Sequence, residues 1–110
     1  MSRKKVDAKF IVKDFIKGLS GITVDNAFVF GSHATGRAKD DSDIDCLIVS
    51  RDFYRMDFLR RLQVLSRARR GLSTIVSMDI FGYTPAEFSE MRQNNTPNIK
   101  KMMREMRQIF

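Results

Sequence analysis

The chain of 110 residues is 43% apolar and 30% charged, so it is long enough for one hydrophobic core and too apolar for intrinsic disorder. Its one cysteine and one histidine exclude an internal disulfide and a zinc site, and its longest apolar runs, such as Cys46–Val49, are too short to cross a bilayer. The net charge of +7 is typical of a protein that binds nucleic acid. We therefore expect one cytoplasmic domain over residues 1–110 and no membrane association.

The N-terminal half of the chain predicts a helix followed by two strands. Apolar side chains recur at helical spacing from about Val6 to Leu19, and the Ser20-Gly21 pair ends that helix. Ala27–Phe30 is a short apolar run before a glycine and indicates a buried strand. Ile44–Val49 is β-branched and apolar, and it indicates a second strand in which Cys46 is a small buried side chain.

The C-terminal half predicts a helix, a strand and two further helices. An apolar helical stripe that Gly71 ends contains Met56, Leu59, Leu62 and Leu65. Thr74–Phe81 indicates a third strand. Pro85 suits the first turn of the next helix, with Thr84 as its N-cap and Glu87 as the capping-box acid. The last stripe consists of Ile99, Met102, Met103, Met106 and Phe110. The predicted order is α, β, β, α, β, α, α, which is an α/β (α+β) chain.

Positive charge is concentrated on the predicted helices, and the predicted strands lie in acidic segments. Residues 51–70 hold seven arginines and two aspartates, whereas residues 21–50 hold two basic and five acidic side chains. We interpret these arginines as a solvated helix face: Arg51, Arg55, Arg60, Arg61, Arg67, Arg69 and Arg70. The charge therefore does not by itself favour RNA over another anionic ligand.

The first acidic segment contains a Gly-Ser pair after a strand and an Asp-x-Asp pair that opens the next strand. Gly31 lets a ligand approach the backbone, and Ser32 adds a hydroxyl and an N–H. A short helix at Ala34-Thr35 is compatible with an anion at its start. Asp43 and Asp45 stand two residues apart, so they project from the same face of a strand. Two carboxylates at that spacing, with no nitrogen or sulfur ligand, favour Mg²⁺ or Mn²⁺.

The second acidic segment supplies a third carboxylate, Asp79, inside an apolar strand. A charged side chain there is costly unless it is paired or binds a metal. If its strand lies beside the Asp-x-Asp strand, three carboxylates converge, as two-metal phosphoryl or nucleotidyl transfer requires. Asp79 would then lie nearest the attacking hydroxyl, as a metal ligand or as the general base.

The pattern Gly31-Ser32-x10-Asp43-x-Asp45, with a later strand aspartate, resembles the DNA polymerase β-type nucleotidyltransferase superfamily. The short chain and the segment around Ser42 resemble its minimal nucleotidyltransferase (MNT) branch. The resemblance implies a small mixed β-sheet with helices packed on it, with ATP as the expected donor. It also implies Mg²⁺ as cofactor, in the form of two ions with Mn²⁺ as the alternative, and transfer of a nucleoside monophosphate to a hydroxyl.

The resemblance also implies roles for the five motif residues. Gly31 and Ser32 would hold the triphosphate, and the metal and catalytic carboxylates would be Asp43, Asp45 and Asp79. Family members often carry arginine where this chain has His33 and Thr35, which puts the strength of phosphate binding in question. Arg37 and Lys39 are candidates to compensate for that loss.

The short chain leaves no room for an acceptor-binding domain, so we expect a partner protein, a second copy of the chain or a small acceptor. MNT proteins typically pair with a HEPN-type ribonuclease as the antitoxin of a toxin–antitoxin system, which makes a protein adenylyltransferase the leading hypothesis. Two alternatives stay open. One is transfer to RNA or to a small molecule such as an aminoglycoside. The other is a catalytically degenerate binding module.

Overall fold

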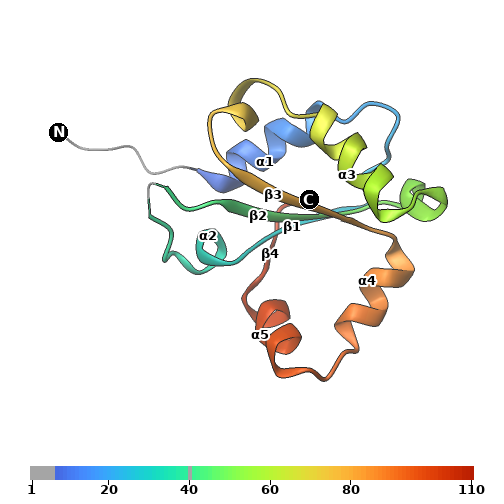
Figure 1. Ribbon diagram of the computed structural model, residues 1–110. Coiled ribbons are helices and arrows are strands. Elements are labelled where there is room, and N and C mark those ends of the chain that lie inside the picture. Colours follow the sequence, from blue (N-terminus) through green and yellow to red (C-terminus); the bar gives the residue numbers. More distant parts are fainter. Residues whose placement is uncertain (1–6, 40) are drawn as a thin grey trace.

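The computed structural model describes residues 7–39 and 41–110 and is built on a mixed β-sheet (Figure 1). Within these residues the sheet has the strand order β3-β2-β1-β4. Its strands are β1 Asn26–Phe30, β2 Ile44–Val49, β3 Met78–Tyr83 and β4 Arg107–Gln108. β1 pairs antiparallel with both β2 and β4, whereas β2 and β3 run parallel. The mixed sheet and its helices confirm the predicted fold class.

Helices α1 Ala8–Lys17 and α3 Phe58–Arg67 cover one face of the sheet (Figure 1). Their apolar stripes pack on alternate residues of β2, namely Ile44, Cys46 and Ile48. Asp7 begins α1, because its side chain accepts a hydrogen bond of 3.1 Å from the Phe10 N–H. The predicted start of this helix near Val6 falls outside the described residues. Burial raises the pKa of the Cys46 thiol to about 12, which keeps it protonated.

Helices α4 Pro85–Arg92 and α5 Pro97–Glu105 lie on the opposite side of the sheet (Figure 1). The other β2 side chains, Leu47 and Val49, join Phe28 and Phe88 in a second apolar cluster beneath them. The predicted capping box is present, since Thr84 accepts from the Glu87 N–H and Glu87 accepts from the Thr84 N–H. No helix among the described residues is long and apolar enough to span a bilayer.

Three short helical segments connect these elements. α2 Ser32–Thr35 follows β1, the 3₁₀ helix η1 Arg51–Arg55 follows β2, and the 3₁₀ helix η2 Gly71–Thr74 precedes β3. The third strand therefore differs from its predicted range of Thr74–Phe81. It begins at Met78 because the preceding segment turns at the surface, where Ile75 is 71% exposed. The strand was predicted from apolar residues expected to be buried, and Ile75 is not buried.

The C-terminal segment also differs from the prediction, since helix α5 ends at Glu105 and does not continue to Phe110. Met106 is already extended, and the chain then pairs with the free edge of β1 as β4. The Ile109 N–H donates to the Ala27 carbonyl at 2.7 Å. Met106 and Ile109 pack in different apolar clusters, as expected for extended backbone that crosses the edge of a sheet.

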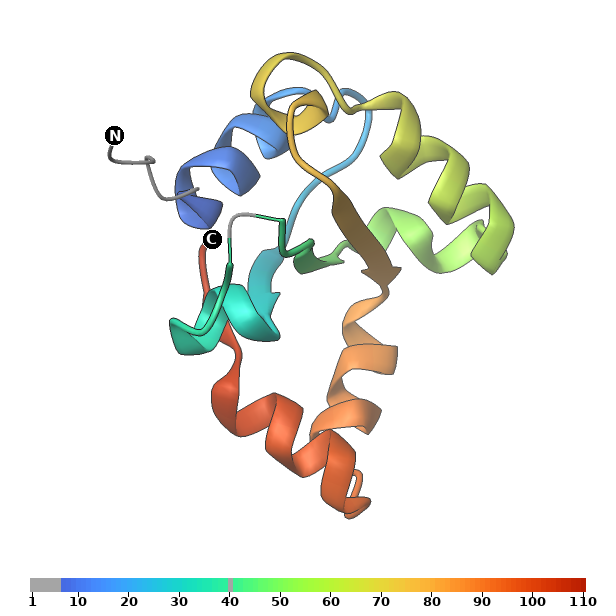
Figure 2. The ribbon, with the colours of Figure 1, turned by 60° about the vertical axis from the view of Figure 1, so that its left-hand side comes forward.

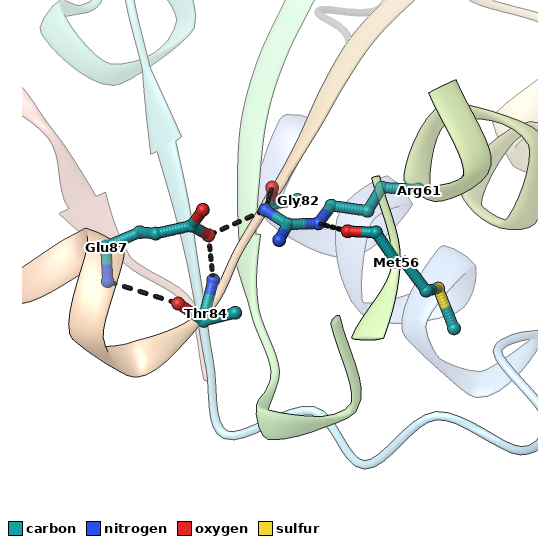
Figure 3. Close-up of polar contacts among 5 residues, drawn as sticks. All are labelled: Met56, Arg61, Gly82, Thr84 and Glu87. Atoms are coloured by element: carbon teal, nitrogen blue, oxygen red, sulfur yellow. Dashed lines mark hydrogen bonds and ion pairs between the residues drawn. The ribbon is translucent and has the colours of Figure 1, made fainter. Parts of the chain in front are cut away.

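One arginine of α3 is not part of the solvated face that the sequence predicts. Arg61 is buried and joins α3 to the start of α4 (Figure 3). Its Nε donates to the Met56 carbonyl at 3.1 Å, and its Nη1 donates to the Gly82 carbonyl at 3.2 Å and to Glu87 Oε1 at 2.6 Å. Burial tends to raise the pKa of Glu87, but hydrogen bonds from Arg61 and Thr84 outweigh it and lower the pKa.

We expect Arg61→Leu to lower the free energy of unfolding by about 2 kcal/mol, because it leaves the Gly82 carbonyl and the Glu87 carboxylate without their donor. The half-exposed Glu87 keeps the loss below that of a fully buried pair. Because the folded-state pKa of Glu87 is lowered, the ion pair contributes above the usual pKa of 4.5 and is lost as pH falls below it. In urea unfolding, the difference in free energy of unfolding between wild type and Arg61→Leu should be smaller at pH 3 than at pH 7.

The matched control is Arg60→Leu, since Arg60 precedes Arg61 on α3 and its side chain is exposed. It should change the free energy of unfolding by less than about 0.5 kcal/mol. If both substitutions changed the free energy of unfolding equally, the hydrogen bonds of Arg61 to Gly82 and Glu87 would not stabilise the fold.

Candidate active site

The turn after β1 brings the backbone of Gly31 against a carboxylate of β2. Gly31 has φ +71°, a conformation that favours glycine, and it caps the short helix α2. A Cβ at this position would lie 2.6 Å from Asp45 Oδ2, well inside the distance of ordinary contact. The predicted Gly31 and the predicted Asp45 are therefore neighbours, and the absence of a side chain at residue 31 leaves space for the carboxylate.

Asp45 and Asp79 lie side by side on adjacent strands. They are register partners in the parallel pair of β2 and β3, and Phe30 of β1 is the partner of Asp45 on the other side. Side chains alternate along a strand, so Asp45 lies on the same face as Leu47, which packs beneath α4 and α5. The predicted convergence of these two aspartates is confirmed by their register.

The electrostatics of Asp45 reflect this proximity. Burial raises its pKa above the usual 3.8, and the Asp79 carboxylate raises it further by its charge and by a shared hydrogen bond. The charge of Asp43 acts in the same direction, while His33 acts in the opposite one. Two carboxylates that repel one another in this way are stabilised by a proton or by a cation between them.

Asp43 lies one residue before β2 and is exposed, as is Asp79. In the part of the chain that the structure describes, no group of three or more His, Cys, Asp or Glu side chains is close enough to hold a metal ion. The structure places Asp45 and Asp79 side by side, and Asp43 is near enough for its charge to act on Asp45. The pair is an all-oxygen donor set with unfavourable mutual repulsion, which fits a hard divalent cation such as Mg²⁺.

The loop from α2 to β2 is held by the only histidine of the chain. His33 Nε2 lies 3.0 Å from the Ser42 carbonyl oxygen, and because a carbonyl only accepts, Nε2 carries the hydrogen. Ser42 also accepts a hydrogen bond of 2.8 Å from the Lys39 N–H through its hydroxyl. These contacts fix the residue that immediately precedes Asp43. His33 therefore has a structural role in the loop, which its position in the sequence alone does not reveal.

Further hydrogen bonds stabilise α2 and join it to β4. The Thr35 hydroxyl donates to the carbonyls of Gly31 and Ser32, at 3.5 and 3.4 Å, so it is directed to the backbone of its own helix. Arg107 of β4 donates from Nε to the Ala34 carbonyl at 2.5 Å. The sequence has no local signal for this contact, because the two residues are 73 positions apart. The apolar stripe had instead predicted a helix at residue 107.

Residues 11–108 match the family model of the nucleotidyltransferase domain. The chain is a member of this family. The resemblance inferred from the Gly-Ser and Asp-x-Asp motifs is thereby confirmed, and the protein is a nucleotidyltransferase. No curated protein matches the chain.

Three solved structures have a similar fold. A candidate nucleotidyltransferase from Sulfolobus solfataricus has a TM-score of 0.55 and 29% sequence identity, over 76% of this chain and 68% of that chain. A toxin–antitoxin structure with AMP-PNP has a TM-score of 0.54 and 15% identity, over 96% of this chain and 73% of that chain. A mutant of the toxin–antitoxin MntA-HpeT has a TM-score of 0.52 and 11% identity over the same shares. The two toxin–antitoxin structures show likeness of fold alone.

Proposed function

We propose that this nucleotidyltransferase transfers AMP from ATP to a hydroxyl of a partner protein, and so acts as the antitoxin of a toxin–antitoxin system. The observation that carries the proposal is the Asp45–Asp79 carboxylate pair beside the side-chain-free backbone of Gly31. Such a pair serves a cation-dependent transfer of phosphorus groups, and the gap at Gly31 leaves room for a phosphate close to it.

The five motif residues have separate roles in binding and catalysis. Gly31 and Ser32 bind the triphosphate through backbone N–H groups and the Ser32 hydroxyl. Asp43, Asp45 and Asp79 would hold Mg²⁺, which when bound neutralises these carboxylates and polarises the phosphate oxygens. The acceptor oxygen forms a bond to the α-phosphorus, the bond to the bridging oxygen breaks, and pyrophosphate leaves. Asp79 receives the proton of the acceptor hydroxyl or orients that hydroxyl.

The choice of a protein acceptor is supported by the toxin–antitoxin structures, which share the fold over 96% of this chain and one of which holds AMP-PNP. A HEPN-type ribonuclease is the partner that the MNT resemblance implies, and the cytoplasm is the compartment in which both would meet. RNA and small-molecule hydroxyls are the other acceptor classes that the same site chemistry can serve.

The experiment incubates the chain with Mg²⁺ and the product of the neighbouring gene, using ATP labelled either at the α- or at the γ-phosphate. The α-label should appear on the partner protein and the γ-label should not, because pyrophosphate leaves. Asp45→Ala should give no label. Asp41→Ala, which removes an exposed acid of the same loop, should label normally. Label in added RNA or in an aminoglycoside, and none on the protein, would refute the protein acceptor.

A further inference from the structure

A cavity of about 840 Å³ is lined by residues of the sheet and of helices α4 and α5. Figure 2 shows where these two helices lie next to the sheet, with α4 in orange and α5 in orange-red. The floor of the cavity includes Phe28 of β1 and Val49 of β2, and its walls include Phe88 and Arg92 of α4 together with Met103 and Arg104 of α5. Nothing in the triphosphate or carboxylate site described above uses this cavity. It is also far larger than the cavity of about 250 Å³ that touches Asp79 at the edge of the sheet.

The cavity lies on the same face of the sheet as the carboxylates. Val49 stands four residues beyond Asp45 on β2, which corresponds to about 13 Å along a strand. The side chains of Leu47 and its register partners Phe28 and Phe81 lie between the two positions. A few residues of extended polypeptide span that distance. A segment seated in the cavity can therefore place a hydroxyl at the Asp45–Asp79 pair.

The charge of the cavity favours an anionic ligand. Arg92 and Arg104 line it, and no acidic side chain does so among the described residues. The ion pairs found in the same part of the chain involve other arginines, so neither guanidinium has a carboxylate partner there. The positive charge of this groove is uncompensated and is available to a ligand of opposite sign.

The aromatic residues of the cavity favour a polypeptide over RNA. Phe28 and Phe88 stack on one another at 4.8 Å between ring centroids, and both are buried, so neither offers an open ring face to a nucleobase. Arg92 lies over the Phe88 ring, with its Cζ 5.7 Å from the centroid. Met103 supplies a flexible thioether, which adapts to varied apolar side chains of a peptide.

We propose that this groove binds an acidic segment of the acceptor protein and directs its hydroxyl to the Asp45–Asp79 pair. The inference rests on the proposed function in taking the acceptor to be a protein, and it adds the chemistry of the segment that is recognised. Carboxylates of the segment pair with Arg92 and Arg104, and its apolar side chains contact Met103 and Met106, which are partly exposed in the cavity.

The test measures binding by fluorescence anisotropy without ATP or Mg²⁺, so its outcome does not depend on transfer activity. The probe is a fluorescein-labelled random copolymer of glutamate and tyrosine. The wild-type chain should bind it, and the double variant R92E/R104E should bind it about tenfold or more weakly. The matched control K9E/K13E changes the net charge equally on exposed positions of α1, across the sheet, and should bind within about twofold of wild type.

A second, neutral variant, R92Q/R104Q, removes the charges without adding repulsion and should lie between these two affinities. Failure of the wild-type chain to bind the copolymer would overturn the proposal, as would equal losses for R92E/R104E and K9E/K13E. Tighter binding of labelled poly-uridine, weakened by the same groove substitutions, would assign the groove to nucleic acid. If binding behaves as expected but no protein accepts AMP, the groove stands and the proposed function fails.

Discussion

Asp45→Asn should abolish nucleotidyl transfer and at the same time make the metal-free protein more stable. We expect activity to fall about a thousandfold or more, because the substitution removes a carboxylate from the pair that would hold the cation. We expect the midpoint of thermal unfolding at pH 7 to rise by about 2–4 °C, because the neutral amide removes the repulsion with Asp79.

The pH dependence of this gain follows from the direction of the pKa shift. The folded-state pKa of Asp45 is raised above the usual 3.8 by burial and by the neighbouring carboxylates. Ionised Asp45 therefore penalises the folded state at neutral pH, and the penalty disappears as pH falls below the unfolded-state pKa. Thermal unfolding with a chelator should show the stability gain at pH 7 and its loss near pH 3.

Two comparisons make the Asp45→Asn result specific. Asp41→Asn changes the same charge at an exposed position two residues before Asp43, and it should alter neither activity nor stability. Added Mg²⁺ should stabilise the wild-type chain and leave the variant unchanged. A variant that is less stable than wild type without metal would show that the two carboxylates do not repel one another.

Gly31→Ala should lower activity about a hundredfold, even though it adds a single methyl group. That methyl carbon would lie 2.6 Å from Asp45 Oδ2, so the carboxylate or the turn must move. Residue 31, with φ +71° and ψ −152°, lies in a region that is essentially open only to glycine, which adds a cost of about 1–3 kcal/mol for an L side chain. We expect the free energy of unfolding to fall by about 2–4 kcal/mol in total. Steady-state kinetics and urea unfolding measure the two effects.

Gly36→Ala is a control for a positive φ without the contact with Asp45, although the left-handed conformation of Gly36 is less restrictive than that of Gly31. Gly36 lies at the other end of α2 with φ +78°, but a Cβ there would meet nothing within 4 Å. It should therefore lose about 1 kcal/mol of stability and keep most of its activity. If both alanine variants lose activity to the same degree, the effect comes from the mobility of the turn and not from the approach of residue 31 to the carboxylate.

The elements that the sequence predicted well are those with a local signal. The strand Ile44–Val49 has the predicted bounds, and the capping box at Thr84 and Glu87 marks the start of α4 in the correct place. The two-residue strand β4 has no such signal, because its partners on β1, Phe28 and Val29, lie far earlier in the chain. The methionines at helical spacing before β4, namely Met102, Met103 and Met106, favoured a helix that continued to the end of the chain.

In the candidate site, too, local features could be predicted and contacts between distant residues could not. Gly31 and the Asp-x-Asp pair could be selected from residue types and spacing, but their proximity to Asp79 depends on the register of β2 and β3, which the sequence does not reveal. The buried Arg61 was placed on a solvated face because its partners, Gly82 and Glu87, come from a later part of the chain. The individual roles of the five motif residues in binding and catalysis remain predictions.

The hydrogen bond from Arg107 to Ala34 joins residues 73 positions apart. It places the last strand of the chain in direct contact with the helix that follows Gly31. A purification tag, a fluorophore or a fused protein attached after Phe110 would lie next to β4, whose Arg107 contacts α2. Reporters for activity assays are therefore better placed away from β4 and from the groove between α4 and α5.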